Sequence, residues 1–135
     1  MNMKEALSRH EWILMEALWN RSPMFLSEIM EATKSSVDWS PSSYSTYLKR
    51  MTDKGLITYK TISGYRCYSP KVAREDCIET ETSYILSKMT EESKRLLLVS
   101  MIEKSGLTDK DRAELHELIA RLGNGAKKEN GHEST

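Results

Sequence analysis

The 135-residue sequence has few of the residues that usually carry covalent or metal chemistry. Its two cysteines, Cys67 and Cys77, have neither the spacing of a metal-ligand set nor the number needed for a disulfide framework. Its three histidines, His10, His116 and His132, are scattered along the chain. It contains no glycine-rich phosphate loop and no nucleophile motif. The sequence therefore predicts no enzyme, no bound metal and no cofactor.

Long hydrophobic runs are absent as well. No stretch approaches the ~18 uncharged apolar residues of a membrane span. The first residues, MNMKEALSRHEW, lack the basic-then-apolar order of a signal peptide. Hydrophobic residues make up 39% of the chain and charged residues 30%, as in an ordinary soluble globular protein. We expect a cytoplasmic protein that has no membrane partner.

The formal net charge of zero hides an uneven distribution of charge along the chain. Residues 39–70 contain five basic residues and one acidic residue, 5 − 1 = +4. The basic residues are Lys49, Arg50, Lys54, Lys60 and Arg66, and the acidic one is Asp53. A local excess of positive charge suits contact with one polyanionic surface, such as nucleic acid.

Two short helices are predicted before residue 34. Ser8 followed by Glu11 forms a capping box, which marks a helix start. Trp12, Met15 and Trp19 then recur at helical spacing, and the NRSP stretch ends this helix. A second helix is predicted from residues that share one face: Leu26, Ile29, Met30 and Thr33. The polar stretch KSSVD follows as a break.

A third helix is predicted from Pro41 to the residues before Gly55. Ser40 is its N-cap, Pro41 takes the first helical position, and Gly55 stands at the C′ position. At about 100° per residue, one side of this helix is apolar and the other is hydroxylated and basic. The apolar side consists of Tyr44, Tyr47, Leu48 and Met51. The opposite side consists of Ser42, Thr46, Lys49 and Asp53, with Ser45 and Arg50 at its edges.

The stretch LITYKTISGYRCYSP changes to a period near two, which predicts a β-hairpin with its turn at Ser63-Gly64 and its end at Pro70. The three helices alone would fit any small bundle. Followed by a hairpin, they predict a winged helix-turn-helix domain over residues 1–71, in a protein that is mainly α with a small β-hairpin wing.

Residues 72–123 have only helical patterns and predict a three-helix dimerisation domain. A helix over about 72–89 is followed by one that contains RLLLVSMI, which is apolar on almost every side. A last helix is predicted from Thr108 to Gly123, and residues 124–135 are predicted to be a disordered tail. So much apolar surface is hard to bury within one short chain, which favours a homodimer. The predicted dimer contacts are Ile85, Met89, Leu96, Leu97, Val99, Met101, Ile102, Leu115, Leu118 and Ile119.

The hydroxylated face of the third helix has two interpretations. Surface helices are usually solvated, but such a face normally carries Glu/Lys pairs and good helix formers. Here it carries hydroxyls, which are mediocre helix formers and can approach base edges in the DNA major groove. We therefore favour DNA binding and predict base contacts from Ser42, Ser43, Ser45 and Thr46, and phosphate contacts from Lys49, Arg50, Lys60 and Arg66. An internal ion pair is the alternative role for Arg50.

These stretches, EWILMEALW, WSPSSYSTYLKRMTDKGLI and RCYSP with a three-helix tail, resemble the penicillinase repressor family. This family includes methicillin-resistance repressors and copper-responsive repressors. The resemblance covers about residues 6–122 and implies a homodimeric winged-helix transcriptional repressor that binds a palindromic operator of double-stranded DNA. The alternatives are a winged-helix module that binds proteins and no DNA, and a transcriptional activator.

The sequence departs from the family pattern at several positions. Ser42 stands where the family usually has lysine, Ser43 where it has threonine, and Tyr47 where it has an aliphatic residue, so the usual family operator is not implied. Many relatives are inactivated by a sensor-triggered cleavage at an Asn-Phe bond. The matching positions here are Ser100 and Met101, which lack that motif, so a sensor-protease pathway is unsupported. No Cys-x-Cys motif follows Cys77, which excludes copper sensing by that route.

The remaining aromatic and sulfur-containing residues are expected to be structural. Trp12, Trp19 and Trp39 suit packing in the core or at the domain edge better than stacking on a ligand. Cys67 and Cys77 are expected to be half-buried thiols, with a redox switch between them as the alternative.

Overall fold

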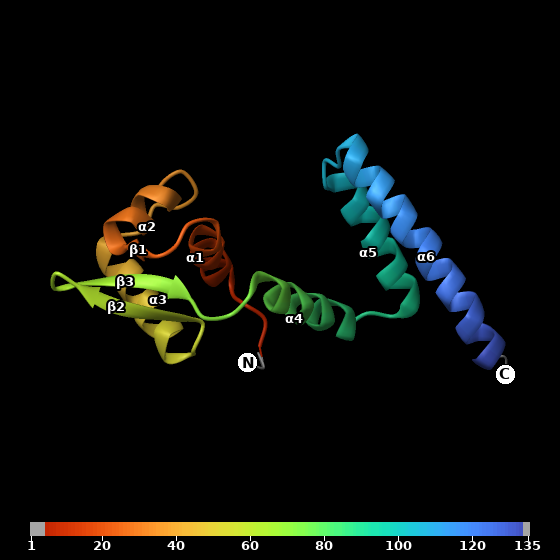
Figure 1. Cartoon of the computed structure of the whole chain (residues 1–135), viewed down its shortest axis with the longest axis horizontal. Coiled ribbons are helices and arrows are strands. Elements are labelled where there is room, and N and C mark those ends of the chain that lie inside the picture. The colour runs from red at the N-terminus through yellow and green to blue at the C-terminus, as the bar shows by residue number, and fades with distance from the viewer. Residues whose placement is uncertain (1–4, 134–135) are drawn as a thin grey trace. The chain divides into compact units, whose positions relative to one another are not determined.

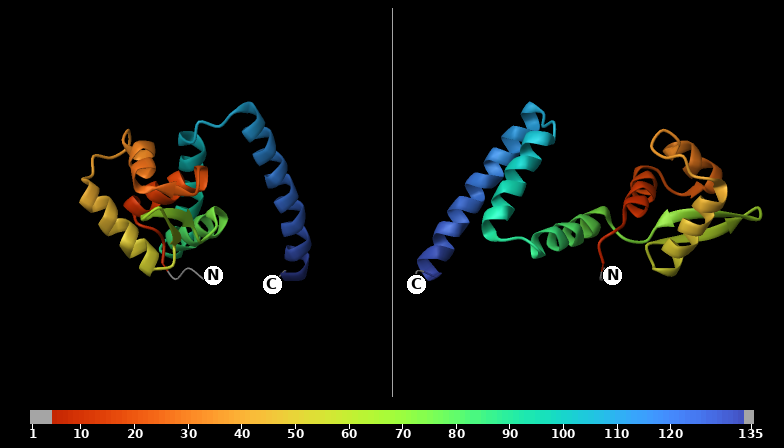
Figure 2. Two further views of the ribbon diagram at one scale, coloured as in Figure 1. Left: turned by 60° about the vertical axis from the view of Figure 1, so that its left-hand side comes forward. Right: turned by 180° about the vertical axis from the view of Figure 1, so that it is seen from behind.

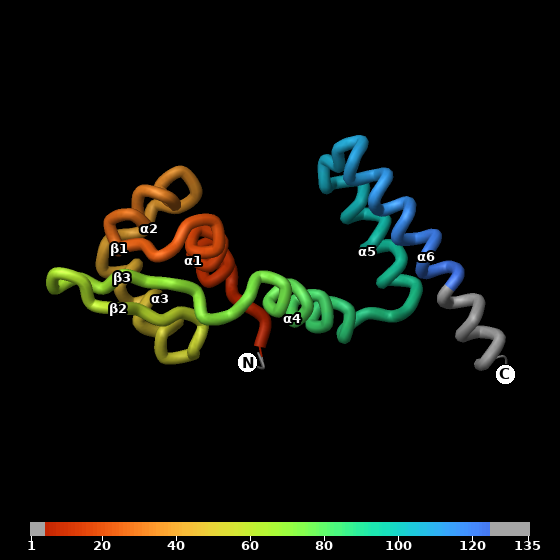
Figure 3. The backbone as a smooth tube through the Cα atoms, in the orientation of Figure 1, coloured from red at the N-terminus to blue at the C-terminus, as the bar shows by residue number. Residues whose placement is uncertain are grey.

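The computed structural model describes residues 5–133, and it describes the side chains of residues 5–124. The chain divides into two compact units, residues 1–88 and residues 89–135 (Figure 1). The first unit contains α1 (Arg9–Asn20), β1 (Met24–Phe25), α2 (Leu26–Thr33), α3 (Pro41–Asp53), β2 (Ile57–Ile62), β3 (Tyr65–Pro70) and α4 (Arg74–Ser87). The second contains α5 (Glu91–Lys104) and α6 (Asp109–Glu133). Figure 3 traces the path of the chain through these elements.

The first unit has the winged helix-turn-helix fold predicted from the sequence. Its sheet is antiparallel with the strand order β1-β3-β2. The β2–β3 hairpin, which forms the wing, turns through Ser63 and Gly64, whose φ angles are 53° and 84°. Positive φ at both central residues is the property of a type I′ turn, which matches the twist of the strands. Figures 1 and 2 show the tip of this hairpin projecting beyond the helices.

The first three helices surround one apolar core. Each contributes the face that its periodicity predicts, and the fully buried side chains include Leu14, Met15, Leu18, Ile29, Leu48 and Met51. All three tryptophans are partly buried and pack against this core, as expected. The strand β1 was not predicted, because two residues are too few to show a period of two.

Both ends of the third helix agree with the prediction. The Ser40 side chain accepts a hydrogen bond from the Ser43 N–H at 3.2 Å. At the other end, Gly55 has a φ of 82°. The Gly55 N–H donates to the Thr52 carbonyl and the Leu56 N–H to the Met51 carbonyl, each at 3.0 Å. These two bonds form a Schellman motif, which requires the left-handed conformation that glycine adopts without strain.

An ion pair that sequence analysis missed joins α1 to the end of α3. Lys54 Nζ lies 2.7 Å from Glu11 Oε2, and the side chains of Glu11 and Lys54 are 4% and 54% exposed. Glu11 also completes the predicted capping box, since its Oε1 accepts from the Ser8 N–H at 2.9 Å. Burial raises the pKa of the Glu11 carboxyl, but the hydrogen bonds from Lys54 and Ser8 outweigh it, so the pKa lies below the ordinary value of 4.5. The carboxylate is therefore charged and paired inside the first unit.

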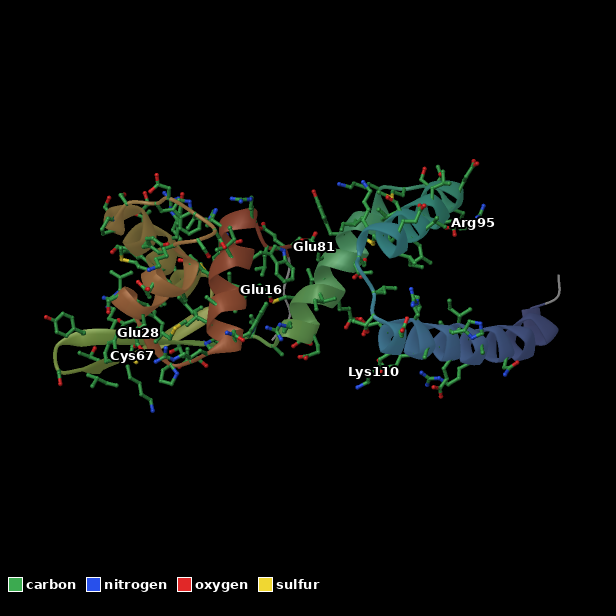
Figure 4. All side chains as sticks on the ribbon, turned by 90° about the horizontal axis from the view of Figure 1, so that it is seen from above. Glu16, Glu28, Cys67, Glu81, Arg95 and Lys110 are labelled. Carbon is green, nitrogen blue, oxygen red and sulfur yellow. The ribbon has the colours of Figure 1, made fainter. Side chains whose placement is uncertain are left out.

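The helix α4 is part of the first unit, although the sequence assigned it to the helical region after residue 71. Its Cys77 is buried in the core. Trp12 Nε1 donates to Glu81 Oε1 at 2.8 Å, and Arg74 pairs with Glu16 at 3.2 Å. Figure 4 labels Glu16 on α1 and Glu81 on α4, in the region where these two helices meet. These contacts hold α4 in the first unit, which extends to Lys88.

The second unit consists of helices with little burial of their own. Thr90 caps α5 by accepting a hydrogen bond from the Ser93 N–H at 3.2 Å, and no residue of α5 is buried. Thr108 caps α6 in the same way, accepting from the Asp111 N–H at 3.1 Å. The structure continues α6 to Glu133, beyond the end predicted at Gly123. A glycine inside a helix costs only about 1 kcal/mol, so Gly123 by itself does not mark a helix end. Disorder of residues 124–135 stays a prediction, and residues 134–135 lie outside the described part of the chain.

Candidate nucleic-acid interface

The helix α3 is held in the first unit by its apolar side, which leaves the opposite side in solvent. Tyr44, Leu48 and Met51 are buried. The Tyr44 hydroxyl lies 2.5 Å from Thr33 Oγ1, which in turn donates to the Ile29 carbonyl at 2.8 Å. This buried chain of hydrogen bonds ties α3 to α2, so the orientation of the exposed side of α3 is fixed by the core.

Aromatic stacking anchors α3 to the start of α1 as well. The Tyr47 ring stacks on His10 with a centroid distance of 4.1 Å. Trp39 meets the edges of Tyr44 and Tyr47, with centroid distances of 5.2 and 5.0 Å. The aromatic residue at position 47 therefore packs against His10 and Trp39, while the exposed side of α3 stays clear of this cluster.

The hydroxyls predicted to contact bases differ in their exposure to solvent and in their hydrogen bonds. Ser42, Ser45 and Thr46 are exposed. Ser43 is half-buried, and its hydroxyl accepts a hydrogen bond from Ser40 Oγ at 3.1 Å. Ser42 Oγ also lies 3.1 Å from Ser40 Oγ. The first turn of α3 and its N-cap thus carry a connected group of serine hydroxyls, in which Ser40 and Ser42 are exposed and Ser43 is half-buried.

Two basic residues lie on α3. Lys49 Nζ is 3.3 Å from Asp53 Oδ2, and both side chains are exposed. Such an exposed pair is worth only a few tenths of a kcal/mol, so it does not prevent Lys49 from reaching another anion. Arg50 is exposed and forms no ion pair with any described residue. The internal ion pair considered for Arg50 is formed by Lys54 instead.

The wing carries the other two basic residues of the predicted site. Lys60 and Arg66 are both exposed on the hairpin. The Arg66 guanidinium lies over the Tyr59 ring, 4.3 Å from its centroid. Stacking of this kind orients a guanidinium while leaving its N–H donors available. The first unit thus exposes four basic side chains, Lys49, Arg50, Lys60 and Arg66, on α3 and the wing.

Of the ten predicted dimer contacts, five are exposed and five are half-buried. Exposed apolar residues on α5 and α6 are Leu96, Leu98, Val99, Met101, Leu118, Ile119 and Leu122. Half-buried residues of the predicted set are Ile85, Met89, Leu97, Ile102 and Leu115. The prediction did not include Leu98 and Leu122, although both belong to the apolar runs that it was based on. At the positions matching the family's cleavage bond, Ser100 is half-buried and Met101 is exposed on α5.

The thiols have the properties of structural residues. Cys67 and Cys77 are both buried and form no disulfide. Burial, together with the neighbouring Asp76 carboxylate, raises the pKa of the Cys77 thiol to about 11. A thiol with this pKa is protonated at neutral pH, which disfavours a redox role for it.

No other chemical site is evident in the part of the chain that the structure describes. Its His, Cys, Asp and Glu side chains form no group of three or more that could hold a metal ion. Among the same residues, no helix combines the length and the apolar character that crossing a membrane requires.

Comparison with known proteins agrees with the fold and with the motifs. The family described as penicillinase repressor matches residues 7–121. The penicillinase repressor of Bacillus licheniformis is 21% identical over 113 residues, which are 84% of this chain and 88% of that protein. The methicillin resistance regulatory protein MecI of Staphylococcus aureus (strain N315) is 24% identical over 118 residues, which are 87% of this chain and 96% of MecI.

One similar solved structure is the solution structure of the Bacillus licheniformis BlaI monomeric form in complex with the blaP half-operator. It is 24% identical, it covers 56% of this chain and 93% of its own, and its TM-score is 0.48. The family match spans most of both units, as the motifs predicted. The chain therefore belongs to the penicillinase repressor family, a family of transcriptional repressors and not of enzymes.

Proposed function

We propose that this protein is a homodimeric transcriptional repressor that binds a palindromic operator through α3 and the wing. The observation that carries the proposal is the exposed side of α3. It presents Ser42, Ser45 and Thr46 beside Lys49, while the other side of the helix is locked into the core. Short hydroxylated side chains can approach base edges in the major groove, and Lys or Arg can neutralise the phosphates beside them.

Base contacts are assigned to Ser42, Ser43, Ser45 and Thr46. Ser42, Ser45 and Thr46 are exposed, and Ser43 is half-buried with its hydroxyl accepting a hydrogen bond from Ser40 Oγ. Phosphate contacts are assigned to Lys49, Arg50, Lys60 and Arg66, all of which are exposed. Because a serine replaces the lysine that the family usually has at position 42, the operator sequence should differ from the usual one.

Dimerisation is assigned to the apolar residues of α5 and α6, together with Ile85 and Met89, which precede α5 in the sequence. Exposed leucine, isoleucine and valine side chains in this number are unfavourable in water, and a second copy of the chain would bury them. A symmetric dimer would hold two copies of α3 at a fixed separation. Half-sites about 34 Å apart, one turn of DNA, or a multiple of that, would then match the dimer.

Two rival functions use the same fold. A module that binds only proteins would need an apolar exposed side on α3, and the exposed residues there are hydroxylated or charged. An activator would use the same DNA contacts, but the matching family and the Bacillus licheniformis relative are both named penicillinase repressor, which supports repression.

Salt dependence of DNA binding tests the proposal. Fluorescence anisotropy with a labelled duplex from upstream of the protein's own gene should give a logarithm of the binding constant that falls linearly with the logarithm of the salt concentration. Lys49→Ala removes one phosphate contact per protomer, two per dimer, so the slope should become shallower by about 2.

The control is Lys110→Ala, which makes the same change in charge at an exposed position on α6. Its slope should equal that of the wild type. Equal slopes for Lys49→Ala and Lys110→Ala would remove Lys49 from the interface, and an absence of salt-dependent binding in the wild type would remove the proposed function.

A further inference from the structure

A cavity of about 640 Å³ lies between the wing and the beginning of α2. Its walls come from the end of β1, the first turns of α2 and the residues on both sides of the Ser63-Gly64 turn. Volumes of roughly 300–1,000 Å³ are those that small organic ligands fill in proteins. The lining contains no residue of α3, and Arg66 is the one residue that this cavity shares with the proposed DNA contacts.

The lining of this cavity is largely apolar. Leu26 and Met30 contribute from α2, and Ile62 and Tyr65 contribute from the wing. Ile62 and Tyr65 are cross-strand partners beside the turn, and they are 46% and 72% exposed. Polar residues would be expected at a solvated hairpin tip, so two large apolar side chains next to a cavity indicate a surface that an apolar body would cover.

Arg66 is the one charged residue among those that line the cavity. It is exposed, and no described acidic residue pairs with it. In the same unit, Arg21 pairs with Glu28 at 2.8 Å and Arg74 pairs with Glu16 at 3.2 Å. The Arg66 guanidinium is therefore oriented by the Tyr59 ring without being neutralised, and its planar donor fork matches a carboxylate.

We propose that this cavity binds a small organic anion that has an aromatic body and one carboxylate. The carboxylate would bind the Arg66 guanidinium, and the aromatic body would lie against Leu26 and Met30 of α2. A consequence follows that rests on the proposed function. Arg66 is also assigned to an operator phosphate, and one guanidinium in this position serves one anion at a time. The ligand would then weaken DNA binding by occupying Arg66.

A titration of the full chain with two matched probes tests the site in the absence of DNA. The probes are 1-naphthaleneacetate and its neutral isostere 1-naphthaleneacetamide, and the readout is the ¹H–¹⁵N amide spectrum. The acetate should shift amides in residues 25–30 and 62–68 and should bind about tenfold more tightly than the amide, since a hydrogen bond to a charged group contributes about 1.5 kcal/mol and 1.4 kcal/mol is a factor of ten. Shifts confined to α5 and α6, or equal affinities for the two probes, would overturn the proposal.

Amino-acid substitutions separate the contribution of the Arg66 charge to ligand affinity from the contribution of the cavity's shape. Arg66→Gln should lower the affinity for the acetate about tenfold and leave that for the amide unchanged. Ser27→Trp, at an exposed position that lines the cavity, should block both probes by filling it. Lys71→Gln is the control, because Lys71 is exposed in the same unit and does not line the cavity. Loss of acetate binding in Lys71→Gln, or unchanged binding in Arg66→Gln, would refute the site.

DNA binding is measured separately. With duplex DNA, 1-naphthaleneacetate should weaken binding by the wild type and have no effect on binding by Arg66→Gln. If the probes bind as described and the protein binds no DNA, the proposed function fails and the ligand site stands. If DNA binds and the probes do not shift the cavity residues, the ligand site fails and the proposed function stands.

Discussion

Replacing Lys54 with methionine keeps most of the aliphatic stem and removes the ammonium group that pairs with Glu11. The Glu11 side chain is 4% exposed and its Oε2 lies 2.7 Å from Lys54 Nζ, so the variant leaves a buried charge that keeps the hydrogen bond from the Ser8 N–H and loses the one from Lys54. A hydrogen bond to a charged group contributes about 1.5–3 kcal/mol. Because about half of the Lys54 side chain reaches water, we expect Lys54→Met to lower the free energy of unfolding by about 2 kcal/mol.

Removing the charge of Glu11 instead of that of Lys54 should lower the free energy of unfolding by less. In Glu11→Gln the amide oxygen still accepts from the Ser8 N–H, and the half-exposed Lys54 ammonium is solvated. We expect a loss of about 1 kcal/mol. The double variant should be more stable than the sum of the two losses predicts, since it leaves no unpaired buried charge.

The pH dependence of the free energy of unfolding distinguishes the loss of the Lys54 charge from a loss of packing by its aliphatic stem. In the wild type the pKa of Glu11 is lowered, so its contribution is complete above pH 4.5 and is lost as the pH falls through the lowered pKa. Lys54→Met removes the hydrogen bond and the charge of Lys54, both of which lower this pKa, so we expect burial to raise the pKa of Glu11 in the variant and the folded variant to take up a proton more readily than the unfolded chain. The gap in stability between the wild type and Lys54→Met should therefore narrow as the pH falls from 7 to 5.

Urea unfolding followed by tryptophan fluorescence measures these values for the first unit, because Trp12, Trp19 and Trp39 all lie within it. A gap that stays constant between pH 7 and pH 5 would show that the lost stability comes from packing. Equal losses in Lys54→Met and Glu11→Gln would refute the argument from the buried carboxylate.

Other regions of the molecule give further predictions. Leu96→Asp places a charge on the exposed apolar side of α5, so sedimentation should show a monomer, whereas Lys110→Asp should sediment like the wild type. A dimeric Leu96→Asp would exclude this side of α5 from the dimer interface. Tyr44→Phe removes a buried hydrogen bond to α2 and should cost about 1 kcal/mol in urea unfolding, while Tyr65→Phe, at an exposed position, should cost nothing. Cys77 has a pKa raised to about 11, so iodoacetamide at pH 8 should label it only after unfolding; fast labelling of the folded protein would contradict its burial.

Local signals explain why much of the first unit could be predicted from the sequence. Ser40 and Pro41 are residues that favour the start of a helix, and Gly55 is one that favours its end. Ser63-Gly64 suits a two-residue hairpin turn. The family was recognisable for the same reason, since its motifs are short and contiguous.

Long-range contacts account for what the sequence did not reveal. Lys54 and Glu11 are 43 residues apart, so no local pattern pairs them. The assignment of α4 to the first unit depends on Cys77 and on the hydrogen bond from Trp12 to Glu81, which also join distant segments. The cavity beside Arg66 needs α2 and the wing together, and neither stretch alone predicts it.

Photocrosslinking to DNA tests the central claim most directly. A photoreactive amino acid, p-benzoylphenylalanine, would replace Thr46 on the exposed side of α3 or, as a control, the exposed Thr82 on α4. With a duplex from upstream of the protein's own gene, we expect crosslinks from position 46 to bases in two half-sites and none from position 82. Crosslinks from position 82 without any from position 46 would contradict the placement of α3 in the DNA groove.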